Sequence, residues 1–378
     1  MRLLFASDSF KGSLTSAQTA ELLEEAALQV FGPCSCEGLT VADGGEGTTE
    51  AVVGAVGGTW RHVLAHDPLQ RELEVTYGAL DDRRAILETA SASGLPLLAP
   101  EERDPLRTST YGTGEVLRDA LDRGFDEVTV ALGGSATNDG GMGCLRALGV
   151  RFLDGDGHEL EGTGEDLLRV SHVDVLGMHP RVRDVRFVAM CDVDNPLCGP
   201  DGATHTFGPQ KGATGASLEL LERGMRNYRD VLVRELGCDP DAIPGAGAAG
   251  GLGAALAVFL GAELRPGIET VLDLVGFDRR LEGVSLVVTG EGRTDWQSCH
   301  GKVMQGVGNR CRSHGVPAIA LCGSLGPGAL QIMDEGIDSL MVTVNAPMTL
   351  DEAMADAPGL YKEAALRMFR LVKVGMRL

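Results

Sequence analysis

The sequence predicts an α/β protein with two domains, on three observations. Glycine is frequent, at 53 of 378 residues, and aromatic residues make up only 4%, which is typical of folds with many tight connections. Short apolar runs near both chain ends alternate with segments of helical periodicity, which predicts a doubly wound parallel sheet. Alternating apolar and polar residues between positions 60 and 90 predict an antiparallel hairpin instead. We therefore expect one domain to combine both chain ends and a second domain to be inserted into it.

The composition excludes several classes of protein. The formal net charge of −21 excludes nucleic-acid binding through the overall electrostatic field. No apolar run approaches the roughly 18 residues of a membrane span, and the apolar core at the N-terminus is too short for a signal peptide. The nine cysteines include no CxxC pair and no zinc-ligand spacing with histidine. We expect a cytoplasmic protein with reduced thiols, in which local cations or a metal ion meet any anionic ligand.

The first elements are expected to open the doubly wound domain. The apolar run 2–6 predicts a strand, and Thr15 or Ser16 can cap the helix that follows it. A second strand is expected at 39–41, followed by a helix over 50–56. The turn between the first strand and its helix lacks the GxGxxG pattern, which argues against a nicotinamide cofactor there.

The middle of the chain mixes parallel and antiparallel signals. It begins with the hairpin expected at 73–87. The Asp-Gly turn within residues 150–160 predicts a second hairpin. A calcium-binding loop is not favoured there, because the twelve-residue ligand pattern is missing. Residues 244–253 contain GxGxxG without a preceding strand, so we reject a dinucleotide fingerprint and expect a helix N-terminus that approaches a ligand closely. The other elements expected in this part are helices at 115–123 and 217–236 and strands at 128–132 and 185–189.

The last third of the chain returns to a βαβα pattern. Residues 284–289 predict a buried strand, and a helix around Cys311 follows it. Two further strands, at 318–321 and 340–344, precede a long terminal helix over 350–374. This spacing indicates that the chain returns to its first domain.

One glycine-rich turn follows the strand at 128–132 and precedes a helix that starts at Met142. It brings small hydroxyls and bare backbone N–H groups to the carboxyl end of a strand, where open α/β sheets bind ligands and a helix N-terminus favours an anion. An ordinary tight connection is the alternative, but it needs only one or two glycines. We therefore expect a phosphate-binding turn formed by Gly133, Gly134, Ser135, Thr137, Asn138, Asp139, Gly140 and Gly141.

Three of the five lysines lie beside glycine in polar turns: Lys11, Lys211 and Lys302. Arginine supplies most positive charge elsewhere, so these lysines are interpreted as point charges for a phosphate or carboxylate group. Chance placement is the alternative interpretation.

Carboxylates also gather after the predicted strands. Asp43 and Glu46 lie among three glycines and suit Mg²⁺ ligation, although Glu46 could simply favour the N-terminus of a helix capped by Thr48. Asp192 and Asp194 are two residues apart, so an extended segment points both the same way. One could be a metal ligand and the other a base, or the two could belong to an Asx turn.

The strand at 284–289 leads into a further charged group. Glu291, Arg293 and Asp295 follow it directly, and Lys302 comes within about a dozen residues. Acids and bases delivered together by one strand end are typical of an active site.

This collection of turns, lysines and carboxylates fits phosphoryl transfer, which needs positioning and charge neutralisation by Mg²⁺ and lysine more than covalent chemistry. The sequence has neither a Walker pattern nor protein-kinase signatures, and its eight histidines lie in no recognisable nucleophile setting. A cleft between two domains would close to exclude water. The alternatives are a non-catalytic nucleotide or small-anion sensor and, less favoured, a nicotinamide dehydrogenase.

Seven segments spread over nearly the whole chain resemble, in order, the motif series of the bacterial glycerate kinase family, type I: SDSFKGSLTS, VADGGEGTTEA, GGSATNDGGMG, CDVDNPLCGP, FGPQKGAT, GAGAAGGLGAAL and TGEGRTDWQSCHGK. The resemblance implies ATP- and Mg²⁺-dependent phosphorylation of D-glycerate, giving 2-phosphoglycerate in most members, with 3-phosphoglycerate as the alternative. Thr294, Trp296 and Cys198 depart from the series, but none of them removes a charged group.

The resemblance also implies an architecture. A flavodoxin-like, doubly wound domain is expected from residues 1–60 and 282–378, and an inserted mixed α/β domain from 61–281. The active site is expected in the cleft between the two domains. Nucleic acid and membranes are not expected partners, and homodimer formation stays open.

Roles can be assigned within the motifs. Asp192 is expected to orient or deprotonate the acceptor hydroxyl, with Asp194 and Asp295 as alternatives. The three lysines would neutralise phosphate or the carboxylate of glycerate, and Arg293 could clamp that carboxylate with two nitrogens. The remaining residues expected to contact substrate or phosphate are Asp8, Ser9, Asn195 and Glu291.

Overall fold

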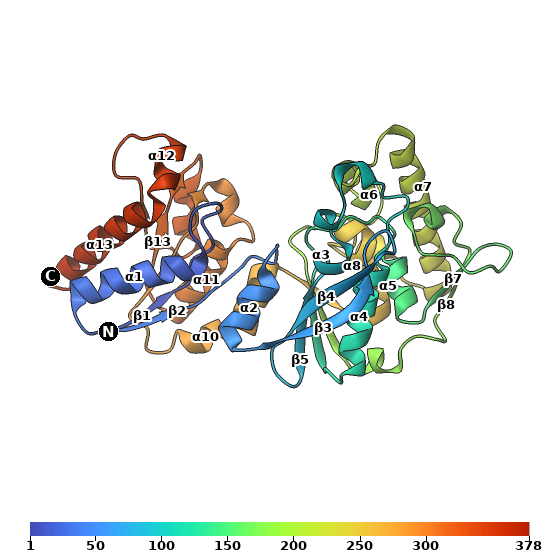
Figure 1. Ribbon diagram of the computed structural model, residues 1–378, viewed down its shortest axis with the longest axis horizontal. Coiled ribbons are helices and arrows are strands. Elements are labelled where there is room, and N and C mark those ends of the chain that lie inside the picture. Colours follow the sequence, from blue (N-terminus) through green and yellow to red (C-terminus); the bar gives the residue numbers. More distant parts are fainter. Residues whose placement is uncertain (378) are drawn as a thin grey trace. The chain divides into compact units, whose positions relative to one another are not determined.

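A computed structural model describes residues 1–377 and divides the chain into two compact units (Figure 1). The terminal unit consists of Met1–Asp43, Gly54–Val56 and Ile268–Leu378, and the central unit consists of Gly44–Val53 and Gly57–Gly267. The two ends of the chain therefore belong to one unit. Within residues 1–377, no helix has the length and apolar character needed to cross a membrane.

The terminal unit is built on a parallel sheet of five strands: β1 (Arg2–Phe5), β2 (Ser35–Gly38), β11 (Leu286–Thr289), β13 (Ala318–Cys322) and β15 (Ser339–Val342). Their order is β15-β13-β11-β1-β2. The chain moves to one side from β1 to β2 and to the other side from β11 to β15, so its direction reverses between β1 and β11. Open α/β sheets bind ligands beyond the carboxyl ends of their strands at such a reversal.

Helices cover both faces of this sheet. They are α1 (Ser16–Phe31), α9 (Gly267–Leu274), α10 (Phe277–Arg280), α11 (Val303–His314), α12 (Leu350–Ala355) and α13 (Ala357–Gly375). Helices α1 and α13 lie side by side (Figure 1), and Leu321 of β13 belongs to their apolar core. The next residue, Cys322, points to the opposite face and contacts Met304 of α11. The sheet is therefore buried on both sides, as parallel sheets require.

The central unit has a mixed sheet of six strands: β3 (Thr59–His66), β4 (Glu72–Ala79), β5 (Arg84–Glu88), β6 (Glu127–Ala131), β9 (Arg186–Met190) and β10 (Glu263–Arg265). Their order is β10-β9-β6-β5-β4-β3, parallel from β10 to β5 and antiparallel from β5 to β3. The antiparallel part confirms the predicted hairpin. The remaining helices are α2 (Thr48–Val56), α3 (Ala90–Ser93), α4 (Tyr111–Asp122), α5 (Met142–Ala147), α6 (Ala203–Phe207), α7 (Gly215–Leu236) and α8 (Ala248–Leu260).

Helix α1 begins where the sequence predicts. The N–H of Gln18 donates to Oγ1 of Thr15 (3.2 Å), and the N–H of Thr15 donates to Oε1 of Gln18 (2.9 Å). This reciprocal capping box satisfies two N–H groups at the helix start and contributes about 1 kcal/mol to stability.

The second strand lies earlier than predicted. It was expected at 39–41, but β2 ends at Gly38 because its partner β1 ends at Phe5, which lies opposite Gly38. Leu39 and Val41 are buried beyond the end of the strand pair. Their apolar character therefore reflects burial next to the sheet and not strand pairing.

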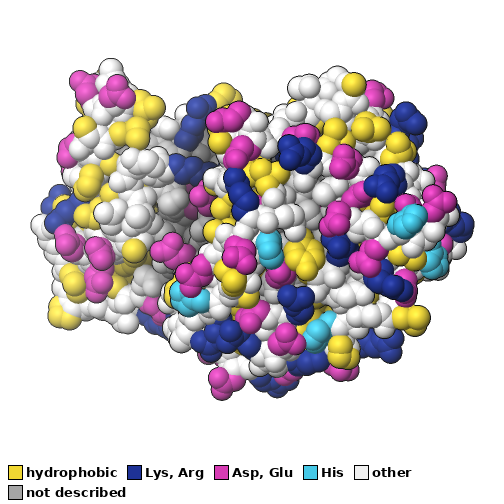
Figure 2. Space-filling view, turned by 45° about the vertical axis from the view of Figure 1, so that its right-hand side comes forward, with side chains coloured by type: hydrophobic (Ala, Val, Ile, Leu, Met, Phe, Trp, Pro, Cys, Tyr) yellow, Lys and Arg dark blue, Asp and Glu magenta, His cyan; other side chains and the backbone are white. Residues whose placement is uncertain are grey.

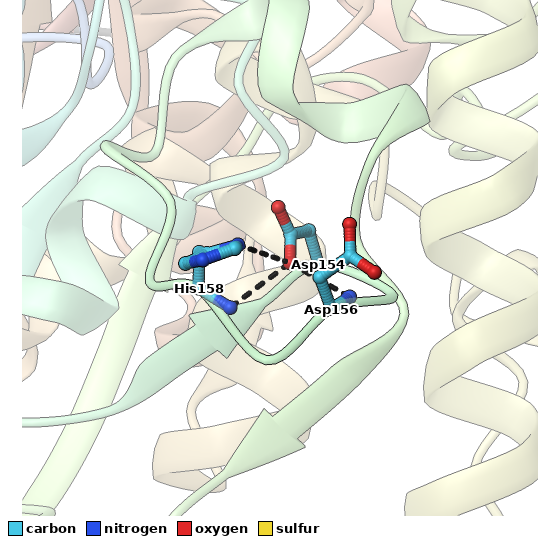
Figure 3. A group of neighbouring side chains, drawn as sticks. All are labelled: Asp154, Asp156 and His158. Atoms are coloured by element: carbon cyan, nitrogen blue, oxygen red, sulfur yellow. Dashed lines mark hydrogen bonds and ion pairs between the residues drawn. The ribbon is translucent and has the colours of Figure 1, made fainter.

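The predicted hairpin at 150–160 is only partly present. Leu153 and Glu159 form a bridge across the turn, but β7 (Arg151–Leu153) takes β8 (His172–Asp174) as its strand partner. The side chain of Asp154 accepts hydrogen bonds from the amides of Asp156 (3.0 Å) and His158 (2.9 Å) (Figure 3). These bonds close the turn within a few residues and make a longer hairpin unnecessary.

The terminal helix predicted over 350–374 is divided into α12 and α13. The division falls at Asp356, and Pro358 is in the first turn of α13. Proline has no N–H to donate and its ring clashes with the carbonyl four residues earlier, so a helix begins with it more readily than it continues through it. The prediction missed this break, and α12 is consequently a separate short helix.

The glycine-rich start of α8 packs against the turn that follows β6. Ala249, Gly250 and Gly251 all have positive φ, and the N–H of Gly140 donates to the carbonyl of Gly250 (3.0 Å). A Cβ on Gly250 would lie 2.0 Å from the carbonyl oxygen of Thr137. These glycines therefore permit close contact between two backbone segments, and the approach of this segment to a ligand stays a prediction. The rejection of a dinucleotide fingerprint is confirmed, because a 3₁₀ turn at Pro240–Ala242, and not a strand, precedes it.

Charges of both signs are interspersed over the face shown in Figure 2. Arg310 illustrates the pairing in detail, with nitrogens 2.6 Å from Glu269, 2.8 Å from Asp273 and 2.8 Å from Asp278. Local pairing of this kind reduces the self-repulsion that a net charge of −21 would otherwise cause.

We predict that Gly250→Ala lowers the free energy of unfolding by about 3 kcal/mol, because it combines a left-handed backbone with overpacking against Thr137. Gly261→Ala is the matched control at the other end of α8. Its φ is +65° but no atom lies within 4 Å of the added Cβ, so only the backbone term of about 1 kcal/mol is expected. Urea unfolding measures both variants, and equal losses would show that the close packing contributes nothing.

Candidate functional site

The terminal unit contains a cavity of about 890 Å³ beyond the carboxyl ends of its parallel strands. The turns after β1, β11, β13 and β15 all contribute to its lining, so it spans the point where the chain direction reverses. Beyond the sheet, β12 (Arg293–Thr294) and β14 (Ser324–Leu325) form a short parallel pair that holds two of these turns together. This is the place where the sequence predicts a ligand.

One end of the cavity is lined by charged side chains. Asp8, Asp43 and Glu291 supply carboxylates, and Lys11 and Lys302 supply ammonium groups. Burial raises the pKa of Asp8 above its usual range, a hydrogen bond from the N–H of Ser9 (2.6 Å) opposes this, and the charge of Asp43 adds to it. The charges of both lysines act in the opposite direction. The five groups therefore interact with one another, although they come from separate parts of the sequence.

The turn after β11 is held by hydrogen bonds among its own residues. The hydroxyl of Ser298 donates to the carboxylate of Glu291 and accepts from the N–H of Asp295 (3.1 Å). Burial raises the pKa of Glu291, while the Ser298 bond and the charge of Lys302 oppose that rise. Asp295 caps the following 3₁₀ turn by accepting from the N–H of Gln297 (2.9 Å). Asp295 thus has a local structural contact, whereas the exposed Arg293 lines the cavity.

In the central unit, polar residues meet at the carboxyl ends of β6, β9 and β10. Oδ1 of Asp192, after β9, accepts a hydrogen bond from the N–H of Gly267, after β10 (2.7 Å). A Cβ on Gly44 would lie 2.8 Å from Cα of Gly267 and 3.4 Å from Oδ2 of Asp192, so a larger residue would crowd this carboxylate. Asp194 is exposed. Asn195 donates to the carbonyl of Asp201 (2.7 Å) and so fixes its own loop.

Lys211 is buried, with 2% of its surface exposed, and contacts the turn after β6. Its Nζ donates to Oγ of Ser135 (2.9 Å) and to the carbonyl of Thr137 (2.7 Å). Burial lowers the pKa of Lys211 to about 7, and the charge of Asp139 opposes that change. The structure therefore places Lys211 where it fixes the backbone of this turn.

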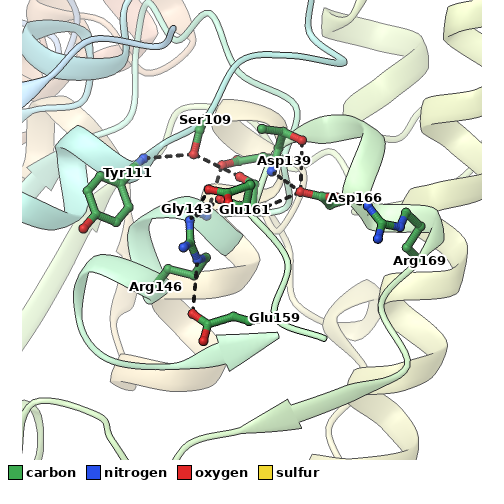
Figure 4. Close-up of polar contacts among 11 residues, drawn as sticks. Ser109, Tyr111, Asp139, Gly143, Arg146, Glu159, Glu161, Asp166 and Arg169 are labelled. Atoms are coloured by element: carbon green, nitrogen blue, oxygen red, sulfur yellow. Dashed lines mark hydrogen bonds and ion pairs between the residues drawn. The ribbon is translucent and has the colours of Figure 1, made fainter. Parts of the chain in front are cut away.

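The turn itself divides into an inner and an outer part. The carboxylate of buried Asp139 accepts from the N–H (2.7 Å) and Oγ1 (2.7 Å) of Thr110 and from the N–H of Gly141 (3.0 Å). It also accepts from the N–H of Gly143 (3.3 Å) (Figure 4). Burial raises the pKa of Asp139, and these hydrogen bonds oppose the rise. The start of the six-residue helix α5 is thus occupied by a carboxylate of the chain itself.

Only the outer part of the turn is exposed. Thr137, Asn138, Asp139, Gly140 and Gly141 are buried, whereas Gly133 and Gly134 are exposed and Ser135 is next to them. The amide of Asn138 donates to Oγ1 of Thr204 (3.0 Å), which is a contact inside the unit.

Among residues 1–377, one group of three side chains has metal-ligand spacing: Asp154, Asp156 and His158 on an exposed turn (Figure 3). The hydrogen bonds that Asp154 accepts from the other two amides account for this arrangement. Of the two residues predicted to hold Mg²⁺, Asp43 lines the cavity of the terminal unit and Glu46 is an exposed residue of the central unit. Carboxylate oxygens are the ligands that Mg²⁺ prefers, so the carboxylates lining the cavity fit this ion by their chemistry.

The sequence did not predict the apolar side of the cavity. Met348, Leu350 and Met354 line it. Leu350 and Met354 lie in the terminal helix predicted over 350–374, and Met348 lies just before it. Two features of the sequence could have indicated a separate helix here. The Thr349–Glu352 capping box marks the start of α12, and Pro358 marks the start of α13.

Comparisons with known proteins agree on one family. A model described as the glycerate kinase family matches residues 3–373. The chain is 43% identical over 364 residues to a glycerate kinase of Halalkalibacterium halodurans (96% of each chain), and 40% identical over 378 residues to the glycerate 2-kinase of Escherichia coli (100% of this chain and 99% of the relative). The crystal structure of a putative glycerate kinase 2 from Salmonella typhimurium LT2 superposes with a TM-score of 0.90 at 39% identity, with full coverage of both chains.

We predict that burial of Lys211 makes stability depend on pH. Its pKa is about 7 in the folded chain and 10.5 when unperturbed, so the unfolded state binds more protons between these values and stability rises with pH. Lys211→Met removes this contribution. In urea unfolding at several pH values, the free energy of the natural chain minus that of the variant should increase from pH 7 to pH 10. Parallel curves would contradict the assignment.

Proposed function

Because this chain belongs to the glycerate kinase family, enzymes that phosphorylate glycerate with ATP, we propose that the cavity of the terminal unit binds ATP. The carrying observation is the pairing of a charged end and an apolar side within one cavity at the carboxyl ends of parallel strands. Its volume of about 890 Å³ lies within the usual range for small-molecule sites. The strand order supports a flavodoxin-like unit, since numbering the five strands along the chain gives 2-1-3-4-5.

The charged end suits the triphosphate. Lys11 and Lys302 would contact phosphate oxygens. Their positive charge would stabilise the transition state, in which negative charge shifts toward the leaving ADP. Asp8, Asp43 and Glu291 would hold Mg²⁺, which neutralises phosphate charge when it is bound. We leave Glu46 out of this set because it is exposed and belongs to the central unit.

Asp192 is the proposed base. Its carboxylate is oriented by the N–H of Gly267 at a strand end, and it is exposed enough to meet a substrate hydroxyl. In the reaction, the hydroxyl oxygen of D-glycerate forms a bond to the γ-phosphorus, the bond from that phosphorus to the β–γ bridging oxygen breaks, and Asp192 accepts the hydroxyl proton. ADP leaves with the bridging oxygen.

Two groups remain as candidates for binding the acid. The exposed backbone at Gly133 and Gly134 could donate hydrogen bonds to it, with Lys211 as a positioning residue that fixes this turn through Ser135. The exposed guanidinium of Arg293 could bind a carboxylate or a phosphate with two nitrogens.

The product is proposed to be 2-phosphoglycerate, on the printed name of the Escherichia coli relative. Phosphorus–proton coupling in the product distinguishes this ester from 3-phosphoglycerate, since phosphorus couples to one proton in the first and to two in the second.

We predict that Lys302→Met raises the KM for ATP about tenfold or more, because a charge-assisted hydrogen bond contributes roughly 1.5–3 kcal/mol. Lys362→Met is the matched control, since Lys362 forms an ion pair with Glu25 (2.6 Å) and does not line the cavity. ADP release at varied ATP measures both variants. An unchanged KM and kcat in Lys302→Met would contradict the proposal that ATP binds in this cavity.

We predict that Asp192→Asn lowers kcat by a factor of about 10²–10⁴ without changing the melting temperature. The amide oxygen can still accept from Gly267, so the local structure should persist. Asp194→Asn is the comparison, and its effect should be less than about threefold. If the large loss follows Asp194→Asn instead, the base is Asp194 and the assignment to Asp192 is wrong.

A further inference from the structure

Part of the cavity lining is apolar and is here named the apolar wall: Leu14, Val342, Met348, Leu350, Ala353 and Met354. Three of these residues, at positions 350, 353 and 354, lie on one face of α12. Leu350 is 74% exposed and Met354 is 39% exposed, which is unusual for large apolar side chains that converge on a cavity.

Helix α12 lies over the turn that carries Lys11. A Cβ on Gly12 would be 3.1 Å from Cε of Met354, so the helix and this turn are in contact. The apolar wall is therefore continuous with the charged end, and a molecule with a triphosphate at the charged end would extend its other end along the wall.

Three polar side chains of the cavity lining already have hydrogen-bond partners. Thr343 donates to the carbonyl of Gly323 (3.4 Å), and Ser13 donates to the carbonyl of Phe10 (2.9 Å). Thr349 caps α12, donating to Glu352 (2.8 Å) and accepting from its N–H (3.3 Å).

Tyr361 and the exposed Ser324 also line the cavity. The hydroxyl of Tyr361 is buried, and Ser324 lies opposite Arg293 in the short β12–β14 strand pair. At the apolar wall itself, the edge of a nucleotide base would meet methyl, methylene and thioether groups.

We propose that the apolar wall binds the base of the phosphoryl donor through its flat face, so that the enzyme accepts purine and pyrimidine nucleoside triphosphates alike. This inference rests on the proposed binding of ATP in the same cavity. Apolar and thioether contacts to a ring are similar for every base, whereas strong discrimination needs hydrogen bonds to the base edge. The two exposed methionine and leucine side chains of α12 can also adjust to rings of different size.

The first test compares kcat/KM for ATP, GTP, CTP and UTP with D-glycerate as acceptor, followed by formation of the phosphoglycerate. We expect the four values to lie within about tenfold. A preference for ATP above about a hundredfold would show that main-chain groups read the base and would overturn the inference, while leaving the proposed function intact. Absence of turnover with all four donors would instead contradict the proposed function.

The second test uses Met354→Asn, a neutral change that does not repel phosphate. We expect KM to rise about fivefold or more for each of the four nucleotides. Inhibition by inorganic tripolyphosphate, which has no base, should keep the same inhibition constant. Met333→Asn is the matched control, because Met333 is 45% exposed and does not line the cavity.

Leu350→Asn repeats the second test if Met354→Asn lowers the melting temperature. An unchanged KM for nucleotides in both variants would overturn the inference. A parallel loss of affinity for tripolyphosphate would do so as well, because it would show a general effect on the cavity.

Discussion

The candidate site of the terminal unit depends on the pairing of β1 with β11. Leu3 lies beside Leu286 in parallel register, although the two residues are far apart in the sequence. The pairing continues past the strands, where the N–H of Asp8 donates to the carbonyl of Gly290 (2.9 Å). Because β1 and β11 end at the same edge of the sheet and in register, Asp8 and Glu291 line one cavity. A slip of one residue would turn every side chain of β1 to the other face.

The central unit uses a different constraint to place its polar residues. Two glycine-rich backbones lie against each other at Thr137 and Gly250, where a side chain would not fit. Beside this contact, Lys211 and Asp139 are buried titratable groups, and burial of their charged forms is costly unless hydrogen bonds compensate for it. Lys211 donates to Ser135 and Thr137 of the turn, and Asp139 within the turn accepts from Thr110. The turn is therefore fixed from two sides, and its exposed glycines have a defined position.

Much of the fold and of the candidate site was predictable from local sequence. A predicted strand that is followed by glycine, hydroxyl and charged residues indicates a ligand-binding turn at the carboxyl end of a sheet. The parallel and antiparallel strands and the three turns that carry lysine follow from such patterns. Burial was harder to predict. Asp139 and Lys211 have the same residue types as ligand-binding groups, and only three-dimensional contacts show that their hydrogen bonds are made within the unit. The apolar wall was missed because Leu350 and Met354 continue the period of the helix that follows them, and one proline marks the division.

The pairing of β1 with β11 also has a consequence for the order in which the chain folds during synthesis. β1 and α1 emerge early, but β11 follows only after the whole central unit has been made. All strands of the central sheet lie between residues 59 and 265, so that sheet can form while the N-terminal segment still lacks its main partner. Folding would then proceed from the middle of the chain outward, with strands β1 and β2 as an exposed edge in the interim. The half-buried Cys34 and Cys36 on that edge would be accessible to oxidants on the ribosome for longer than in the finished protein.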